Sequence, residues 1–216
     1  MKKKMIALLG GILMMGAVYY GTNLEVCASQ TVQEKNLEIN TSKGNVDVKT
    51  TLEQEISCDY DKNKYTVDIV DEGENTLIEI AVKDNVEVIY SDRCIVYVPS
   101  NFDNITITAN KAGVYMTDIN AKIDINCSYG AASIEVPAGF QKEICYVLKN
   151  GSGKITTTNI SDYTITGNIA TSTVSAPAAY NFKKVYGKKE KCSYTSGAGT
   201  AQINVNIENS TVKFAN

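Results

Sequence analysis

The sequence predicts an all-β, single-domain solenoid of short strands that follows an N-terminal export segment. Two observations predict this fold. Thr, Asn, Ile, Val and Tyr are abundant, with 13 Tyr among 216 residues, and β-branched and aromatic residues favour strands. From residue 105 onward, units of one apolar, one outward and one apolar residue recur every 9 to 11 residues, which is the signature of a structural repeat.

The first residues have the three-part layout of a secretory signal peptide. Three lysines, Lys2 to Lys4, precede an apolar run that extends from residue 5 to residue 20. A short polar stretch then leads to Val26-Cys27-Ala28, which places small residues at the −3 and −1 positions. We therefore expect a signal peptide over 1–28 with cleavage after Ala28, and one domain over 29–216.

Two alternatives for this segment stay open. The residues that end at Cys27 resemble a lipobox, in which Cys27 would be acylated. The apolar run would otherwise be retained as an anchor, although it is shorter than the roughly 20 residues that span a bilayer. The mass of the native N-terminus distinguishes the three outcomes.

The first strands are predicted wherever apolar residues alternate or form short runs between polar turns. Asn, Asp, Gly and Lys fill the intervals, as turns require. The predicted strands lie at residues 37–39, 46–48, 65–70, 77–82, 86–90 and 94–99.

The repeat proper consists of six apolar units, and stacked coils explain it best. A three-residue strand buries too little apolar area alone, so it needs the same strand of the next coil beside it. A coil would then contain about 18–21 residues, with Ile105 near Ile123 and Ile123 near Ile144. Outward positions would hold Thr106, Tyr115, Asp124 and Glu135. The units begin at Ile105, Val114, Ile123, Ile134, Ile144 and Ile155.

The C-terminal part predicts a loop followed by two closing strands. Residues 178–199 are irregular and hold a lysine cluster, so we interpret them as a loop excursion. Residues 201–207 alternate cleanly and residues 212–214 form a last short strand. These two strands would pair with each other or cap the open end of the solenoid.

The chain has six cysteines and an odd number in the mature domain. Loss or acylation of Cys27 leaves Cys58, Cys94, Cys127, Cys145 and Cys192, so at least one thiol stays unpaired or bridges another chain. Cys127 and Cys145 are 18 residues apart, close to one coil, and form the candidate disulfide. The alternatives are that most cysteines are small buried apolar residues, or that Ile144 and Tyr146 are the inward pair instead.

The composition argues against catalysis and against nucleic-acid binding. Without any His, neither a Ser-His-Asp nor a Cys-His nucleophile can be built. Cleavage would leave 18 basic and 23 acidic side chains, and an acidic chain is a poor partner for phosphates. We expect no cofactor and no metal. The acidic stretch over 59–74 fits no EF-hand spacing and is interpreted as solvated turns.

Tyrosines suggest where a ligand would bind. Tyr97, Tyr115, Tyr129 and Tyr163 fall in or beside the repeats, and an exposed row of rings would stack on sugars or on a protein surface. The alternative is cross-strand packing between neighbouring side chains.

Two segments resemble the bacterial putative adhesin family. Residues 37–48 are similar to its opening strand, Thr-Ser-x-Gly turn and second strand. Residues 94–107 are similar to its central apolar strand, Val-Pro turn and Ile-x-Ile unit. The resemblance spans about residues 35–216 and implies an exported or membrane-associated right-handed β-helix or β-roll without catalytic residues. The family's Ser-Gly turns are mostly replaced here by Asn, Lys or Tyr-Gly.

The sequence therefore predicts a non-catalytic, exported adhesin-like binding protein at the cell surface or outside the cell. Its partner would be a cell-wall polymer, a glycan or a surface protein. The alternatives are a membrane-associated envelope protein with a sensory or structural role, and a carbohydrate-active β-helix enzyme. Three or more carboxylates that converge in one groove would favour the enzyme.

Overall fold

The computed structural model of this chain describes residues 34–89, 91–180, 182 and 185–216. The expected signal peptide over 1–28, its cleavage point at Ala28 and the acylation candidate Cys27 lie outside the described residues. No helix in the described ranges has the length and apolar character needed to cross a membrane.

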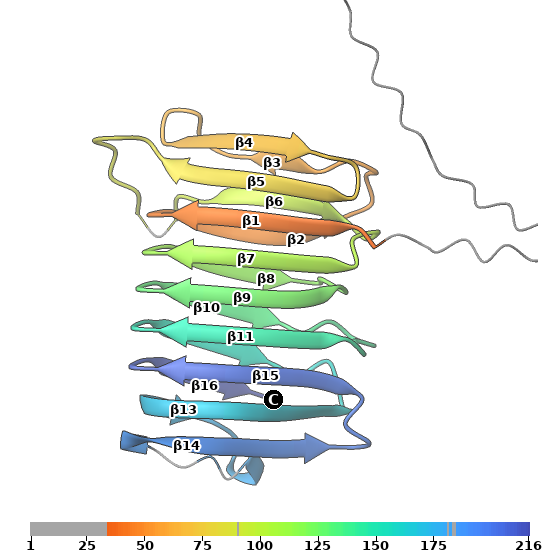
Figure 1. Cartoon of the computed structure of the whole chain (residues 1–216), viewed down its shortest axis with the longest axis vertical. Helices are drawn as coiled ribbons and strands as arrows, with labels where there is room; N and C mark the ends of the chain where they lie inside the picture. Colours follow the sequence, from red (N-terminus) through yellow and green to blue (C-terminus); the bar gives the residue numbers. More distant parts are fainter. Residues whose placement is uncertain (1–33, 90, 181, 183–184) are drawn as a thin grey trace, which may run out of the picture. The chain divides into compact units, whose positions relative to one another are not determined.

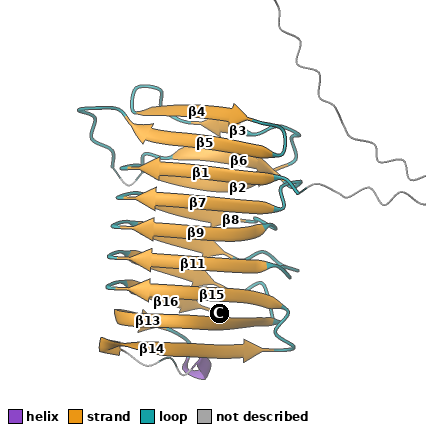
Figure 2. Ribbon diagram, viewed as in Figure 1, coloured by secondary structure: helices purple, strands orange, loops and turns teal. Residues whose placement is uncertain are grey.

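The described residues form two β-sheets, which confirms the all-β prediction (Figures 1 and 2). In spatial order, sheet A contains β4 (Tyr65–Asp71), β5 (Asn75–Val82), β1 (Asn36–Ser42), β7 (Asn104–Asn110), β9 (Lys122–Ser128), β11 (Glu143–Lys149), β15 (Ala201–Glu208), β13 (Tyr163–Ser175) and β14 (Val185–Ser196). Sheet B contains β3 (Ser57–Asp59), β6 (Cys94–Pro99), β2 (Asn45–Thr51), β8 (Gly113–Thr117), β10 (Ala131–Glu135), β12 (Ser152–Thr156) and β16 (Thr211–Ala215). The long strand β13 pairs in both sheets.

Apart from the antiparallel strands β3, β4 and β14, the chain alternates between the sheets, and each strand pairs in parallel with the corresponding strand of a neighbouring rung. We use "rung" for one strand of sheet A and the strand of sheet B that follows it. Ile105 pairs with Ile123, and Ile123 pairs with Ile144, as predicted. The apolar side chains of both sheets point into the space between them. Along β7, Ile105 and Ile107 are buried whereas Thr106 is exposed.

Every rung except β5–β6, whose strands are joined by a longer loop, turns from sheet A to sheet B through the same tight corner. One residue with a left-handed backbone is followed by a small residue. The small residues are required because the corners stack directly on one another: a Cβ at Gly130 would overlap the carbonyl oxygen of Ala112 in the next corner. The corner pairs are Lys43-Gly44, Lys111-Ala112, Tyr129-Gly130, Asn150-Gly151, Thr171-Ser172 and Asn209-Ser210.

Antiparallel strands cover both ends of the parallel stack. β4 pairs antiparallel with β5, and β3 pairs antiparallel with β6. At the other end β14 pairs antiparallel with β13. These strands occupy the edges that would otherwise offer unpaired N–H and C=O groups of an inner rung.

The expectation that the last two strands pair with each other or cap the stack is wrong. β15 lies between β11 and β13 in sheet A, and β16 lies between β12 and β13 in sheet B. The C-terminal rung is therefore inserted into the stack. The cap is supplied by residues earlier in the chain, β13 and β14 (Figure 1).

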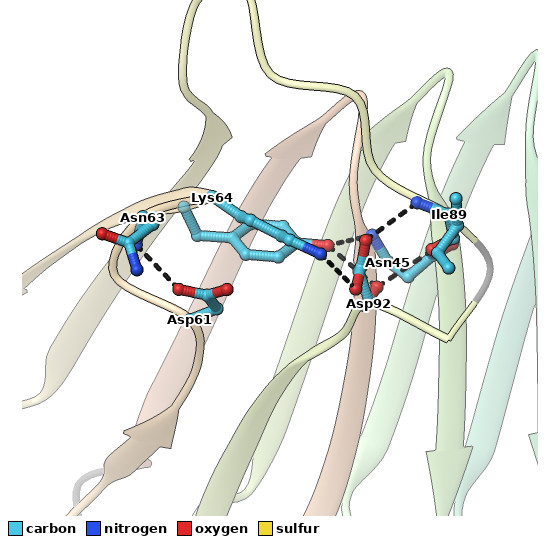
Figure 3. A network of polar contacts seen from close by, with 7 residues as sticks. Asn45, Asp61, Asn63, Lys64, Ile89 and Asp92 are labelled. Atoms are coloured by element: carbon cyan, nitrogen blue, oxygen red, sulfur yellow. Dashed lines mark hydrogen bonds and ion pairs between the residues drawn. The ribbon is translucent and has the colours of Figure 1, made fainter.

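The predicted strand over 86–90 is also wrong, because the described residues 86–89 form a loop. This loop is fastened by polar contacts instead of a ladder (Figure 3). Asp92 accepts hydrogen bonds from the Lys64 ammonium (2.7 Å) and from the backbone N–H of Ile89 (2.9 Å). The Asn45 amide donates to the carbonyls of Ile89 and Asp92. The bonds from the Lys64 ammonium and the Ile89 N–H hold the pKa of the Asp92 carboxyl below its usual range.

The loop predicted over 178–199 is corrected as well. Residues 178–180 form η1 (Ala178–Tyr180), a single 3-10 turn, and β14 follows as a strand. β14 contains three lysines and Gly187, so alternation of apolar residues does not mark it in the sequence. Pairing with β13 gives it strand geometry. Tertiary pairing overrides a weak local preference here.

Candidate functional site

The outer face of sheet A carries ordered rows of polar side chains. Because successive side chains of a strand alternate between faces and the strands pair in register, residues at equivalent positions line up across the rungs. Neighbouring strands in such a row are about 4.8 Å apart. One row runs through Glu38, Thr106, Asp124, Cys145, Asn204 and Thr166.

A groove of about 420 Å³ opens on this face near the β4 end of the stack. Its wall comes from β1, β5, β7 and the end of β4. Polar side chains at its rim include Asn36, Asn75 and Asn104, whereas Val70 and Leu77 contribute apolar surface. The groove thus combines hydrogen-bonding groups with a small apolar patch, which is typical of ligand sites.

Three asparagines form a ladder along the groove. The Asn36 amide donates to Asn75 Oδ1 (3.0 Å), and the Asn104 amide donates to Asn36 Oδ1 (2.9 Å). Asn104 also donates to Glu34 Oε2 at 3.0 Å. The three residues are register partners on three adjacent strands. The ladder therefore fixes the orientation of each amide before any ligand binds.

A second polar cluster holds two carboxylates beside the ladder. The amide nitrogen of Asn40 donates to Glu38 Oε1 (3.0 Å) and to Glu79 Oε1 (2.9 Å). Among the residues that line the groove, Glu38 and Glu72 carry the carboxylates. These oxygens are well suited to accept hydrogen bonds from hydroxyl groups.

Beyond the groove, the row of the three asparagines continues into an ion pair. Asn104 is followed in register by Lys122, whose ammonium lies 3.0 Å from Glu143 Oε2. The Asn204 amide donates to Glu143 Oε1 at 2.8 Å. The contact with Lys122 and the hydrogen bonds from Cys145 and Asn204 hold the pKa of the Glu143 carboxyl below its usual range. Lys122 and Glu143 already pair with each other in this part of the face. The groove is therefore the better candidate for ligand binding.

The predicted row of tyrosines is not one surface. Tyr163 is only 1% exposed because it occupies an inward position of β13. Tyr129 is 62% exposed and occupies a corner between β9 and β10. Tyr97 and Tyr115 are half-buried on the outer face of sheet B.

On sheet B, Tyr115 is part of a charged cluster. The guanidinium carbon of Arg93 lies 4.3 Å from the centre of the Tyr115 ring. Arg93 also contacts Asp47 Oδ2 at 3.4 Å, and the Lys49 ammonium contacts the same oxygen at 3.1 Å. Because the Arg93 cation already covers this ring, the tyrosine is a weaker candidate for stacking on a ligand.

The candidate bridge between Cys127 and Cys145 is not formed, and the register explains why. Cys127 pairs with Leu148, and Cys145 pairs with Asp124. β9 and β11 pair with an offset of 21 residues, Ile123 with Ile144, so an 18-residue separation brings the two cysteines to different rows. Cys127 is buried, whereas Cys145 lies at an outward position of β11. Ile144 and Tyr146 are the inward pair, which is the alternative that the sequence left open.

Two acidic side chains of the stretch over 59–74 accept hydrogen bonds from backbone N–H groups in local turns. Asp61 accepts from the backbone N–H of Asn63 (2.8 Å), and Asp71 accepts from that of Gly73 (2.9 Å). Within the described part of the chain, no three His, Cys, Asp or Glu side chains are grouped so that they would hold a metal ion. From the lysine cluster, Lys189 and Lys191 are exposed on β14.

Sequence reasoning missed the asparagine ladder, although a signal for it exists. Each of the three residues is the first residue of a strand in sheet A: Asn36 in β1, Asn75 in β5 and Asn104 in β7. The same residue type at the same place in three strands predicts a stacked row only once the register is known. The spatial order of the three strands is not their order in the sequence.

Comparison with known proteins gives one structural relative. No family model matches the chain, and no curated protein matches it. The fold is similar to the crystal structure of a putative cell adhesion protein from Clostridium sporogenes ATCC 15579, with a TM-score of 0.59 and 13% sequence identity. The match covers 85% of this chain and 92% of the other. At this identity the likeness concerns the fold.

Proposed function

We propose that this protein is a non-catalytic, adhesin-like binding protein that holds a neutral, hydroxyl-rich glycan in the groove of sheet A. The observation that carries the proposal is the ordered row of amides and carboxylates in a groove of about 420 Å³. The solved relative described as a putative cell adhesion protein supports a surface role for the shared fold.

The chemistry of the groove favours a neutral sugar over a charged polymer. Sugar hydroxyls donate to carboxylates and exchange hydrogen bonds with amides, which have both donors and acceptors. The C–H face of a sugar ring would pack on Val70 and Leu77. Glu38 and Glu72 at the same wall would repel phosphate or uronate groups, which also argues against nucleic acid.

We infer that the stack is a right-handed β-helix of the kind that the resemblance to the adhesin family implies. Parallel, in-register pairing of successive rungs supports the solenoid. Connections between parallel strands of one sheet are right-handed in about 98% of cases, which supports the handedness. In this arrangement the rows on sheet A present a regular lattice of polar groups to an extended polymer.

Export remains part of the proposal, because an adhesin acts outside the cytoplasm. It is supported by the basic, apolar and small-residue pattern of residues 1–28. The envelope protein with a sensory or structural role is the alternative if that segment is retained.

The test is binding of neutral and anionic glycans to the purified protein. We expect chitohexaose or cellohexaose to bind in isothermal titration calorimetry and polygalacturonate to bind weakly or not at all. Glu38→Ala should weaken binding of the neutral glycan about tenfold or more, because a hydrogen bond to a charged group contributes about 1.5–3 kcal/mol. Chitohexaose should stay intact after prolonged incubation, whereas shortened products would favour the enzyme.

Asn206→Ala is the matched control. Asn206 is exposed on the same face of sheet A but lies on β15, away from the groove. Its substitution should leave the affinity unchanged. An equal loss in both variants, or a loss caused instead by Tyr97→Ala on sheet B, would contradict the assignment of the groove.

A further inference from the structure

The two outermost strands of sheet A each have one edge without a partner strand. Within the part of the chain that the structure describes, β4 pairs with β5 alone and β14 pairs with β13 alone. The two strands lie at opposite ends of the stack (Figure 1). Each end therefore presents a row of backbone N–H and C=O groups, and such an edge is a template for a strand of another chain.

The apolar core is incompletely covered at the β4 end. Ile69 pairs in register with Ile78, which is buried between the sheets, so both side chains face inward. Ile69 is nevertheless 45% exposed. A hollow of about 250 Å³ opens beside it, and Ile56 and Phe102 contribute to its wall. An exposed apolar side chain beside an unpaired edge marks a surface that another chain can cover.

The two ends of the stack carry opposite charges. The hairpin of β4 and β5, residues 65–82, contains five acidic and no basic side chains. Asp68 pairs in register with Glu79 on the outer face, and like charges directly opposite each other destabilise a sheet. Cations on the free side of β4 would relieve this repulsion. β14 contains three lysines and one glutamate, and its Lys189 and Lys191 are exposed.

We propose that copies of this chain associate head to tail, with β4 of one copy paired to β14 of the next. A symmetric contact between two β4 edges would bring two acidic hairpins together, so the charges favour the contact between unlike ends. Repetition of such a contact produces an open filament unless the copies close into a ring. Sheet A then continues from one copy to the next. The proposal does not depend on what the groove binds.

Strand direction and side-chain faces select the register of this contact. β4 and β14 are both antiparallel to the inner strands of sheet A, so two copies in the same orientation pair them in parallel. Lys191 lies on the outer face of β14, and the buried Cys192 lies on the inner face. When Asp68 lies opposite Lys191, Ile69 lies opposite Cys192 and is covered. A shift by two residues would instead bring Ile69 opposite the charged Glu190.

The first test is sedimentation velocity of the full-length protein over a range of concentrations. The weight-average mass should rise with concentration and pass that of a dimer, because each added copy presents a new free end. It should fall in about 1 M salt, since salt screens exposed charges. A mass that stays at that of the monomer into the millimolar range, or that levels off at the dimer, would overturn the proposal.

Charge reversal tests the contact itself. Asp68→Lys alone and Lys191→Asp alone each bring like charges together, and each should weaken association about two- to thirtyfold. An equimolar mixture of the two variants should associate like the unmodified protein, because every end then meets an opposite charge on the other variant. The chain with both substitutions should recover association by itself for the same reason.

Glu208→Lys is the matched control. Glu208 is exposed at an outward position of β15, an inner strand of sheet A, so the same reversal of charge should leave association unchanged. All variants alter exposed side chains and should keep the circular dichroism spectrum of the unmodified protein. Equal association of all variants, or a mixture that associates no better than each variant alone, would show that these two edges are not the contact.

Discussion

A single missing side chain allows a buried tyrosine to make its hydrogen bond. The Tyr146 hydroxyl donates to the carbonyl of Ala132 at 2.6 Å in the space between the sheets. A Cβ on Gly153 would overlap that hydroxyl. Burial raises the pKa of Tyr146, so the hydroxyl keeps its proton and remains a donor. The Gly153 and Tyr146 positions are therefore coupled.

Gly153→Ala should destabilise the protein by about 1–3 kcal/mol, because overpacking displaces the neighbouring side chain. Tyr146→Phe alone should cost about 1 kcal/mol for the lost hydrogen bond. In the Tyr146→Phe background Gly153→Ala should cost clearly less, since the overlapping oxygen is gone. Urea unfolding of the two single variants and the double variant measures this coupling.

Ser133→Ala provides the control for this cycle. Ser133 points outward from β10, next to the carbonyl-bearing residue Ala132, and its substitution should change stability by no more than about 0.5 kcal/mol. An equal cost of Gly153→Ala with and without the Tyr146 hydroxyl would show that the coupling is absent.

At the scale of elements, the end of the stack near β14 is closed by aromatic packing. η1 brings Tyr180 into contact with Tyr163 and Tyr194, and the hydroxyl oxygens of Tyr163 and Tyr180 lie 2.6 Å apart. Thr157 joins the same hydrogen-bond cluster at 3.1 Å from Tyr180. Phe214 packs against the ring of Tyr180. A short helical turn between two strands thus seals the apolar core from solvent.

Tyr180→Ala should destabilise the protein by about 3–5 kcal/mol, as expected for the loss of a large buried ring. Tyr180→Phe should cost only about 1 kcal/mol, because it removes the hydroxyl contacts and keeps the packing. Each rung of a stacked repeat contacts only its neighbours. Hydrogen exchange should therefore become faster in β13 and β14 and remain unchanged in β7.

The matched control is Tyr129→Ala, which removes the same side chain from an exposed corner. It should leave both stability and hydrogen exchange close to those of the unmodified protein. Uniformly faster exchange in all rungs of the Tyr180→Ala variant would contradict a local role for this cluster.

At the scale of the whole molecule, the order of the rungs in space differs from their order in the chain. The first rung, β1 and β2, lies between β5–β6 and β7–β8. The last rung, β15 and β16, lies between β11–β12 and β13. The first and the last rung of the described residues are therefore inside the stack of strands, and segments from elsewhere in the chain cover them.

Removal of residues 200–216 tests this arrangement. If the C-terminal strands were an end cap, their loss would leave β13 paired with its neighbours. Because β13 instead pairs with β15 and β16 in parallel, the truncation should abolish amide protection in β13 and β14 while β7 and β9 keep theirs. Hydrogen exchange followed by mass spectrometry measures the difference.

Lys213→Ala, at an outward position of β16, is the control and should preserve protection throughout. Unchanged protection of β13 in the truncated protein would mean that β13 finds another partner and that the inserted rung is dispensable.

The predictions from sequence were accurate where local alternation and stacking agree. β6 was located at its observed bounds, and Ile105, Ile123 and Ile144 were assigned to one row that the structure contains. The prediction over 86–90 failed because an alternating apolar pattern forms a strand only if a neighbouring edge is available. Tyr163 was predicted to be exposed, but its side chain faces inward. Which face of β13 a side chain occupies depends on the pairing register, and the sequence does not encode that register locally.

The sequence by itself determined the all-β class, most of the strands and the apolar rows, because side-chain alternation and turn residues act over a few neighbours. Only the tertiary structure decided the order of the rungs, the antiparallel caps and the asparagine ladder. These features depend on pairing between segments that are distant in the chain. The backbone hydrogen bonds of one strand can be satisfied equally well by many partner strands. Packing of the complete core therefore determines which strands pair.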